Sequence, residues 1–358
     1  MAGVRVQSTQ IDTRVAPLPK AAWFGAAALF AAAGLGWLAA PAAFWPHPER
    51  LAPLAYFALD NRDSAVLALA RARSTAVHEA GIVLLGSSAA REALWPEDRL
   101  QEAMGQTALN LTSSGQNPLE SLFLLEQQPL AAGQRVVLFV GLSALGQARF
   151  AERLEAGDFL VDAAGFLARQ ADAGRIEWQA KGGLDEYRRQ FSGLRRVLAR
   201  ATHQALPAMI RGRLYGTRPP QPLAHYYDGL EPPAIRRATE TPEALHGRLG
   251  RHAERNLESY ARLIEAIAAH CRRQGAVLSL VETPHRPGDT GVLFASWWGP
   301  YAEHLRRIAA AQAVPYLDLA DAVAFADGDF FDAVHLTPSG REKWSSALVA
   351  ALRRPPKS

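Results

Sequence analysis

Five short runs of aliphatic and β-branched residues, separated by helix-like stretches, constrain the fold of this chain most strongly. The runs are GIVLLG (81–86), the stretch around LNLTSS (109–114), RVVLFVG (135–141), AVLSLVE (276–282) and VPYLDL (314–319). Continuous apolar strands that alternate with helices are typical of a parallel sheet covered by helices on both faces. We therefore predict an α/β fold, a three-layer α/β/α sandwich over residues 81–350, with a helical insertion at about 150–250 and a tail at 351–358.

Composition excludes several classes of protein. A formal net charge of +4 is too small to indicate nucleic-acid binding. The single cysteine, Cys271, excludes an intramolecular disulfide framework and a cysteine-based zinc site. Its spacing from Tyr260, Ile264 and Ile267 indicates the buried face of a helix, so a buried thiol is favoured over a nucleophile. The histidines show no HExxH or other metal spacing, and we expect no metal and no cofactor.

The N-terminal region contains one long uncharged stretch, residues 21–45. As a helix it would extend roughly 37 Å, enough to cross a bilayer, and tryptophans stand near both ends. We predict a transmembrane anchor, with residues 1–20 in the cytoplasm and 46–80 as a helical stalk. A cleaved signal peptide and a buried helix of a soluble domain are the alternatives. Basic residues precede the segment, which favours a single-pass inner-membrane protein with a periplasmic domain: Arg5, Arg14 and Lys20.

A serine stands directly after the first predicted strand. The strand ends in Gly86-Ser87-Ser88, and AAREAL then begins like a helix. A serine between a strand and a helix N-terminus has an exposed hydroxyl with backbone N–H groups nearby, as a nucleophile and its oxyanion hole require. Gly-Ser-Ser is also ordinary turn and N-cap sequence, so this segment alone leaves both interpretations open.

An acidic residue and a histidine stand three positions apart near the C-terminus. In FFDAVHLTPSG, Asp332 and His335 precede a helix-like stretch. This spacing lets the carboxylate receive Nδ1–H of the imidazole, which leaves Nε2 to act as a base. The pair alone fits a structural hydrogen bond equally well. With Ser88 it completes a Ser/His/Asp set in the chain order Ser, Asp, His, which predicts a serine-dependent enzyme.

These segments together resemble the SGNH (GDSL-like) hydrolase superfamily. The family's first block, Gly-Asp-Ser, is similar to Gly86-Ser87-Ser88, with Ser88 in the nucleophile position. The second block supplies an oxyanion-hole glycine, and Gly115 in LNLTSSGQN occupies that place. The last block, Asp-x-x-His, is similar to Asp332 and His335. Within the superfamily, the chain order resembles the membrane-anchored cell-envelope branch that includes the D-alanine transfer protein of teichoic-acid modification.

The third block departs from the family pattern. Gly-x-Asn-Asp corresponds to Gly141-Leu142-Ser143-Ala144, so the asparagine that stabilises the oxyanion is missing. We expect Ser88 and Gly115 to contribute to the oxyanion hole, with Ser143 as the third donor through its hydroxyl, or Asn117 from the second block instead. Loss of one oxyanion donor typically costs about 10²–10³ in rate.

The resemblance implies a membrane-tethered O-acyltransferase or acylesterase that acts on a cell-surface or exopolysaccharide glycan through an acyl-serine intermediate. Its expected partners are the lipid bilayer, a multi-pass membrane acyl-donor protein and a glycan acceptor. His285, just past the fourth strand, stands at the same sheet edge and is a candidate substrate contact, with a solvent-facing loop histidine as the alternative. Two other functions stay open: a non-catalytic assembly or glycan-binding subunit, and a plain periplasmic lipase or esterase.

Overall fold

A computed structural model describes residues 64–147, 149–155, 159, 163–179, 225, 242–286 and 295–353 of the chain. The predicted cytoplasmic N-terminus and the anchor at 21–45 lie outside these residues, as does most of the predicted insertion. Among the described residues, no helix combines the length and the apolar character that a bilayer crossing needs.

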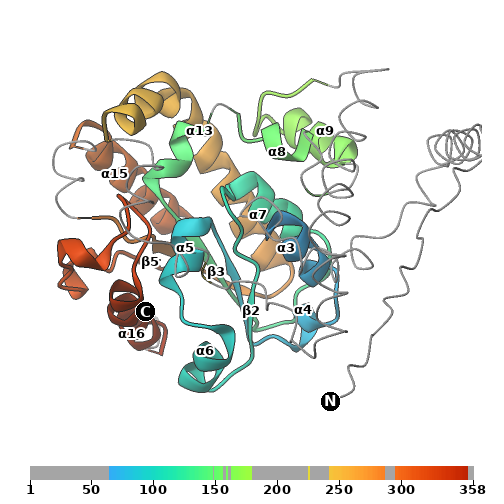
Figure 1. Cartoon of the computed structure of the whole chain (residues 1–358). Helices are drawn as coiled ribbons and strands as arrows, with labels where there is room; N and C mark the ends of the chain where they lie inside the picture. Colours follow the sequence, from blue (N-terminus) through green and yellow to red (C-terminus); the bar gives the residue numbers. More distant parts are fainter. Residues whose placement is uncertain are drawn as a thin grey trace, which may run out of the picture. The chain divides into compact units, whose positions relative to one another are not determined.

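Five parallel strands form one sheet, as the apolar runs predict (Figure 1). Their order across the sheet is β2-β1-β3-β4-β5, and every neighbouring pair is parallel. The prediction of an α/β fold with a parallel sheet is therefore confirmed. The strands are β1 (Ile82–Leu85), β2 (Ala108–Asn110), β3 (Arg135–Val140), β4 (Val277–Glu282) and β5 (Tyr316–Leu317).

Helices pack on both faces of the sheet because the strands are apolar on both faces. On β1, Val83 and Leu85 belong to one buried cluster, whereas Ile82 and Leu84 belong to the other. The first cluster joins the sheet to α3 (Ser64–Ala72), α4 (Ala76–Glu79), α7 (Pro118–Leu125), α13 (Pro242–Arg273) and α15 (Ala295–Gln312). The second joins it to α5 (Ser88–Ala93), α6 (Glu97–Met104) and α16 (Pro338–Arg353).

The segment that we expected to form a stalk contributes instead to the domain where it is described. Ala65 and Leu69 of α3 are fully buried in the first apolar cluster, and α3 contacts α7. The reason is visible in SAVLALARA, whose small and aliphatic residues give α3 an apolar face that packs well against a neighbouring helix. The α/β domain therefore begins by residue 64 rather than at 81.

The predicted amphipathic helix before the fourth strand is present and is longer than its periodicity indicates. It forms the C-terminal part of α13, and Tyr260, Ile264, Ile267 and Cys271 are buried as expected. Burial raises the pKa of the Cys271 thiol to about 12, which suits a core position and not a nucleophile. Within the insertion, the structure describes two short helices, α8 (Glu152–Glu155) and α9 (Ala164–Asp172).

The strand order places a topological switch between β1 and β3. From β1 the chain crosses to β2 on one side, and β3 lies on the other side of β1. Parallel α/β sheets bind ligands outside the carboxyl ends of the strands at such a switch, because the flanking connections leave in opposite directions there. Among the described residues, η2 (Leu142–Gly146) follows β3 and η5 (Ala320–Ala322) follows β5, and η6 (Asp327–Asp329) lies between η5 and the Asp332 loop.

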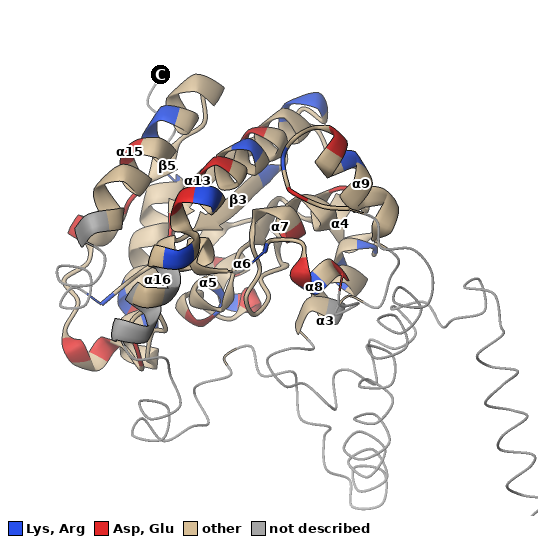
Figure 2. Cartoon of the chain, turned by 90° about the horizontal axis from the view of Figure 1, so that it is seen from above, with Lys and Arg blue, Asp and Glu red and all other residues tan. Residues whose placement is uncertain are grey.

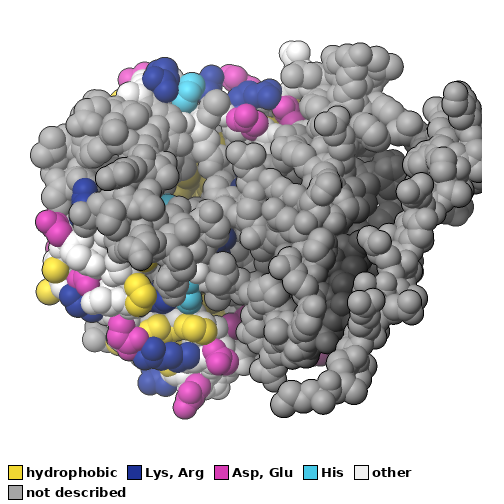
Figure 3. Space-filling view, in the orientation of Figure 1, with side chains coloured by type: hydrophobic (Ala, Val, Ile, Leu, Met, Phe, Trp, Pro, Cys, Tyr) yellow, Lys and Arg dark blue, Asp and Glu magenta, His cyan; other side chains and the backbone are white. Residues whose placement is uncertain are grey.

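Charged residues of both signs are interspersed over the described surface. Along α13, acidic and basic residues alternate in Figure 2, and on the face in Figure 3 they lie beside one another. Where these views show described residues, charges of both signs therefore occur as close neighbours.

Candidate active site

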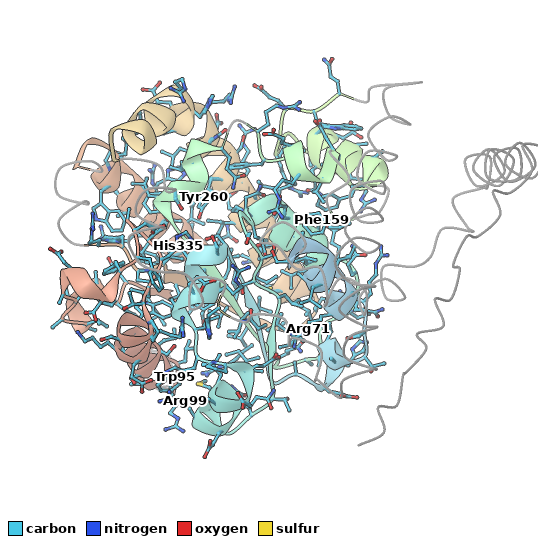
Figure 4. The ribbon with its side chains drawn as sticks, viewed as in Figure 1. Arg71, Trp95, Arg99, Phe159, Tyr260 and His335 are labelled. Carbon is cyan, nitrogen blue, oxygen red and sulfur yellow. The ribbon has the colours of Figure 1, made fainter. Side chains whose placement is uncertain are left out.

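Ser88 and His335 meet at the carboxyl edge of the sheet. Ser88 is the first residue of α5, directly after the turn that ends β1. Its Oγ lies 2.9 Å from His335 Nε2, although the two residues are 247 positions apart in the chain. In Figure 4, His335 lies beside α5, the helix that begins with Ser88. The serine predicted from the Gly-Ser-Ser segment is therefore in hydrogen-bond contact with the predicted histidine.

Asp332 holds the other side of the imidazole. Its Oδ2 lies 2.7 Å from His335 Nδ1, and its Oδ1 accepts hydrogen bonds from the backbone N–H groups of Val334 and His335, each at 2.9 Å. Burial raises the pKa of the Asp332 carboxyl, but the charge of His335 and these hydrogen bonds outweigh it, so the pKa lies below its usual value. The carboxylate stays ionised and favours the tautomer with Nε2 free to accept from Ser88.

The loop that carries both residues is closed on itself. Phe330 and Leu336 form an isolated antiparallel bridge, and Phe331 N–H donates to the His335 carbonyl at 2.8 Å. The Arg286 N–H, just past β4, donates to Ala333 O at 2.8 Å. The side chains of His335 and Asp332 are 13% and 10% exposed, so the pair is shielded yet reachable from solvent.

The loop after β2 presents Gly115 to the same space. Gly115 has a φ of 66°, in the left-handed region that glycine adopts without strain. Its N–H makes no hydrogen bond within the described part of the chain, and the residue lines the cavity beside Ser88. An unpaired backbone donor next to a serine hydroxyl is what an oxyanion hole needs.

Neighbouring side chains fix this loop from several directions. Arg91 of α5 donates to Ser114 Oγ at 3.0 Å, and Arg153 of α8 donates to the Ser114 carbonyl and to the buried Glu120. Gln147 Nε2 donates to the Gly115 carbonyl at 2.9 Å. These contacts hold the Gly115 amide in place before any substrate arrives, and electrostatic catalysis depends on such preorganisation.

The turn after β3 brings Ser143 to the cavity. Ser143 lies in η2 and lines the cavity, and its hydroxyl has no hydrogen-bond partner among the described residues. The turn packs closely, because a Cβ on Gly141 would overlap Thr283 Oγ1. Ser143, one of the two candidates for the third oxyanion donor, is thus at the wall of the Ser88 cavity.

Asn117 lines the cavity but has no amide hydrogen to offer. Its Nδ2 donates to Gln147 Oε1 at 2.8 Å and to the Phe150 carbonyl at 3.1 Å, and its Oδ1 caps α7 through Glu120 N–H. Both amide hydrogens are therefore engaged in holding the two loops together. Of the two candidates for the third oxyanion donor, the geometry favours Ser143.

The cavity at this edge has a volume of about 210 Å³. This volume is smaller than that of pockets for drug-sized ligands, about 300–1,000 Å³, and is suited to a small chemical group. Its walls come from four segments, the turns after β1, β2 and β3 and the Asp332 loop, closed by Tyr260 of α13. Ser87 also lines the cavity, but it is Ser88 that bonds His335.

Packed tyrosine side chains extend from the cavity wall to a buried carboxyl. The Gly141 N–H donates to the Tyr260 hydroxyl at 3.2 Å, and the Tyr260 ring packs against the Tyr301 ring with centroids 6.2 Å apart. Tyr301 and Tyr316 each donate to Glu282 Oε2 at 3.1 Å. Burial, with a smaller effect of the nearby Asp318, raises the pKa of Glu282 well above its usual value, although both tyrosines act in the opposite direction.

His285 is not brought to the serine. Its ring packs against Trp298, with the ring centroids 4.7 Å apart, and it does not contribute to the described lining of the Ser88 cavity. Burial lowers the pKa of its imidazole. The expectation that His285 stands near the same edge fits its position after β4, but the structure provides no contact with the cavity.

The roles of two residues near the cavity were not predicted from the sequence: Tyr260 and Gln147. Tyr260 reads as one more member of the buried face of α13, and only its hydroxyl distinguishes it from its aliphatic neighbours. Gln147 lies in a connection without a motif, yet it links the second and third loops through both ends of its amide. A polar group within an apolar helical stripe was the available signal for Tyr260.

The described residues hold no cluster of three or more histidine, cysteine or acidic side chains arranged for a metal ion.

No family model matches the chain, and no curated protein matches it either. Any assignment of activity therefore depends on the site itself. Chemically, the site combines an ordered hydroxyl, an oriented imidazole and a backbone donor around a small cavity, which is the set required for nucleophilic attack on a carbonyl carbon.

Proposed function

We propose that this protein is a serine-dependent O-acyltransferase or acylesterase of the cell envelope, with an SGNH-like catalytic domain. One observation carries the proposal: the continuous hydrogen-bonded series from Ser88 Oγ to His335 Nε2 and from His335 Nδ1 to Asp332 Oδ2. The SGNH resemblance of the same residues supports it independently of the geometry.

In the proposed reaction, Ser88 Oγ attacks the acyl carbonyl while His335 Nε2 takes its proton. A bond forms between Ser88 Oγ and the carbonyl carbon, and the oxyanion lies toward the N–H groups of Ser88 and Gly115 and the Ser143 hydroxyl. The leaving oxygen then departs with the proton held by His335. A sugar hydroxyl or water attacks the acyl-Ser88 ester, gives its proton to His335 and releases Ser88.

The small cavity favours a short acyl group such as acetyl over a fatty chain. About 210 Å³ accommodates the reacting ester and little more, and the lining mixes polar side chains with Phe139 and Tyr260. This supports a glycan acylation role over the plain lipase alternative, because a lipase must accommodate a long apolar chain.

The membrane anchor and the partners belong to the proposal as well. A helix over residues 21–45 would hold the domain on the periplasmic side of the inner membrane, where a multi-pass donor protein delivers acyl groups and a glycan accepts them. That arrangement favours transfer over release to water. It rests on the apolar segment and on the resemblance to the tethered envelope branch.

A non-catalytic glycan-binding or assembly subunit is the second candidate. The serine at position 143, in place of an asparagine, favours it, because one strong oxyanion donor is replaced by a rotatable hydroxyl. The bonded triad opposes it, since a protein without chemistry has no need to maintain a catalytic tautomer of His335.

Trapping the acyl-enzyme separates the two candidates. The full chain is incubated with p-nitrophenyl acetate, quenched in acid, and digested for mass spectrometry of the peptide that contains Ser88. We expect acetyl on Ser88 in the native protein, none in Ser88→Ala, and retained acetylation in Ser87→Ala. No acetyl-Ser88 in the native protein, with the fold intact by circular dichroism, would favour the non-catalytic subunit.

A further inference from the structure

A second, larger cavity lies beside the Ser88 cavity and shares a wall with it. Its volume is about 580 Å³, within the usual range for ligand pockets. Phe150 lines it, and the Phe150 carbonyl accepts from Asn117 of the first cavity at 3.1 Å. Tyr260 lines the first cavity, and Asn256, one helical turn earlier on α13, lines the second.

The shared wall is rigid. Asn256 is 5% exposed, and its Nδ2 donates to the carbonyls of Leu145 and Gln147 at 2.8 and 2.6 Å, on the segment that joins the two cavities. The rings of Phe150 and Tyr260 pack with centroids 6.2 Å apart. A ligand in the larger cavity would therefore lie at a fixed position relative to Ser88.

Several polar groups in the lining of the larger cavity have no hydrogen-bond partner among the described residues. Asn256 Oδ1, Ser259 Oγ, the indole N–H of Trp178 and the amide of Gln179 have no partner among the described residues. The same lining includes the half-buried indole ring of Trp178. Donors and acceptors next to an aromatic ring suit sugar hydroxyls, which both donate and accept, and a sugar's apolar C–H face.

The charges around this cavity nearly cancel. Arg149 is paired with Glu155 at 2.6 Å, and the other charged residues in the described part of the lining are Arg255 and Glu177, of opposite sign. A strongly anionic ligand would call for an excess of arginine. The balance points to a neutral ligand.

We propose that the larger cavity is a subsite for a neutral, hydroxyl-rich glycan, which holds the acceptor chain next to the residue that is acylated. The assignment of an acceptor role rests on the proposed function, whereas sugar binding itself does not. In this arrangement Trp178 stacks on a sugar ring, and Asn256 Oδ1, Ser259 and Gln179 bond its hydroxyls. The small cavity then receives only the acyl group and the accepting hydroxyl.

Binding is measured directly on the full-length Ser88→Ala protein, in which acyl transfer does not interfere. Calorimetry and saturation-transfer NMR are run with four probes: cellotetraose, mannotetraose, chitotetraose and tetragalacturonate. We expect at least one neutral tetrasaccharide to bind with an affinity of roughly millimolar or better. We expect tetragalacturonate to bind more weakly than the best neutral probe.

Two variants in the Ser88→Ala background locate the site. Trp178→Ala should weaken binding roughly tenfold through the lost ring surface, and Ser259→Ala about two- to tenfold through one lost hydrogen bond. Trp297→Ala is the matched control, because Trp297 is also a half-buried tryptophan of the same apolar cluster and lines neither cavity. Its affinity should equal that of the parent.

Several results would overturn the subsite: no binding of any neutral probe at about 10 mM, binding of tetragalacturonate alone, or equal affinity in Ser259→Ala and the parent. Ser259→Ala decides the question even if Trp178→Ala fails to fold, because it removes only a hydroxyl. Sugar binding without any acetyl-Ser88 would refute the proposed acyl transfer, whereas the sugar-binding subsite would still be supported. Acetyl-Ser88 without sugar binding would do the reverse.

Discussion

Replacing Tyr260 with phenylalanine tests whether its buried hydroxyl positions the turn that carries Ser143. The change keeps the ring, which packs against Phe150 and Tyr301, and removes only the hydroxyl that accepts from Gly141 N–H at 3.2 Å. Gly141 is buried, so its N–H is left without a partner. An unsatisfied buried donor costs about 1–3 kcal/mol, and we expect the free energy of unfolding to fall by that amount.

The same loss should reach the chemistry, because Gly141 begins the turn that carries Ser143. If the whole of that energy were lost from the transition state, kcat would fall about 5- to 150-fold. We expect the lower end of this range, since the turn is also held by its contact with Thr283. Urea unfolding measures stability, and initial rates of p-nitrophenyl acetate hydrolysis give kcat and KM. The decrease should appear in kcat, with little change in KM.

Tyr316→Phe provides the matched control. It also removes one hydroxyl from the Glu282 cluster, donated at 3.1 Å, but Tyr316 has no contact with Gly141. We expect a stability loss of about 0.5–1.5 kcal/mol and a kcat within roughly twofold of the native value. Equal losses of kcat in the two variants, or an unchanged kcat in Tyr260→Phe despite lower stability, would refute a positioning role for Tyr260.

Three further outcomes follow from the site. Ser88→Ala and His335→Ala should each abolish hydrolysis of p-nitrophenyl acetate, with the double variant little worse than either; rate losses that multiply would contradict a joint mechanism. Gly141→Ala should destabilise the domain by about 1–3 kcal/mol, and Thr283→Ala should restore much of the loss by making room for the new Cβ, as urea unfolding of the double variant will show. Because burial raises the pKa of Glu282, the native free energy of unfolding should fall as the pH rises from about 4.3 through that raised pKa. Glu282→Gln should lack this slope, and an identical pH profile in both proteins would argue against it.

The sequence was sufficient for the parts of the fold that depend on periodicity. Apolar runs predicted all five strands, and the Ser88 and Asp332/His335 segments identified residues that meet although they are far apart in the chain. The roles of Asn117 and Tyr260 could not be predicted in this way. Whether an amide is free to donate, or a tyrosine hydroxyl faces a turn, depends on partners from other segments, and a linear pattern does not record those partners.

The N-terminal boundary of the domain could not be predicted from the sequence either, for a different reason. The residues of α3 are mostly alanine and leucine, a composition equally suited to an exposed stalk and to a packed helix. Only the presence of a complementary surface on α7 decides between them. Sequence analysis therefore locates candidate catalytic side chains better than it locates the residues that hold them in place.

Under the proposed function, the 247 positions between Ser88 and His335 also determine when the serine becomes reactive. The last helix of the domain, α16, is fastened to α5 by Arg341, which donates to the Glu92 carbonyl at 2.8 Å, and by Ser345, which donates to the Ala93 carbonyl at 2.8 Å. During synthesis the serine emerges 247 residues before the histidine, and this clamp follows the histidine. An incomplete chain thus carries an unactivated serine. Under the same proposal, a serine-reactive probe would label only molecules in which α5 and α16 have come together, and so would count assembled domains rather than total protein.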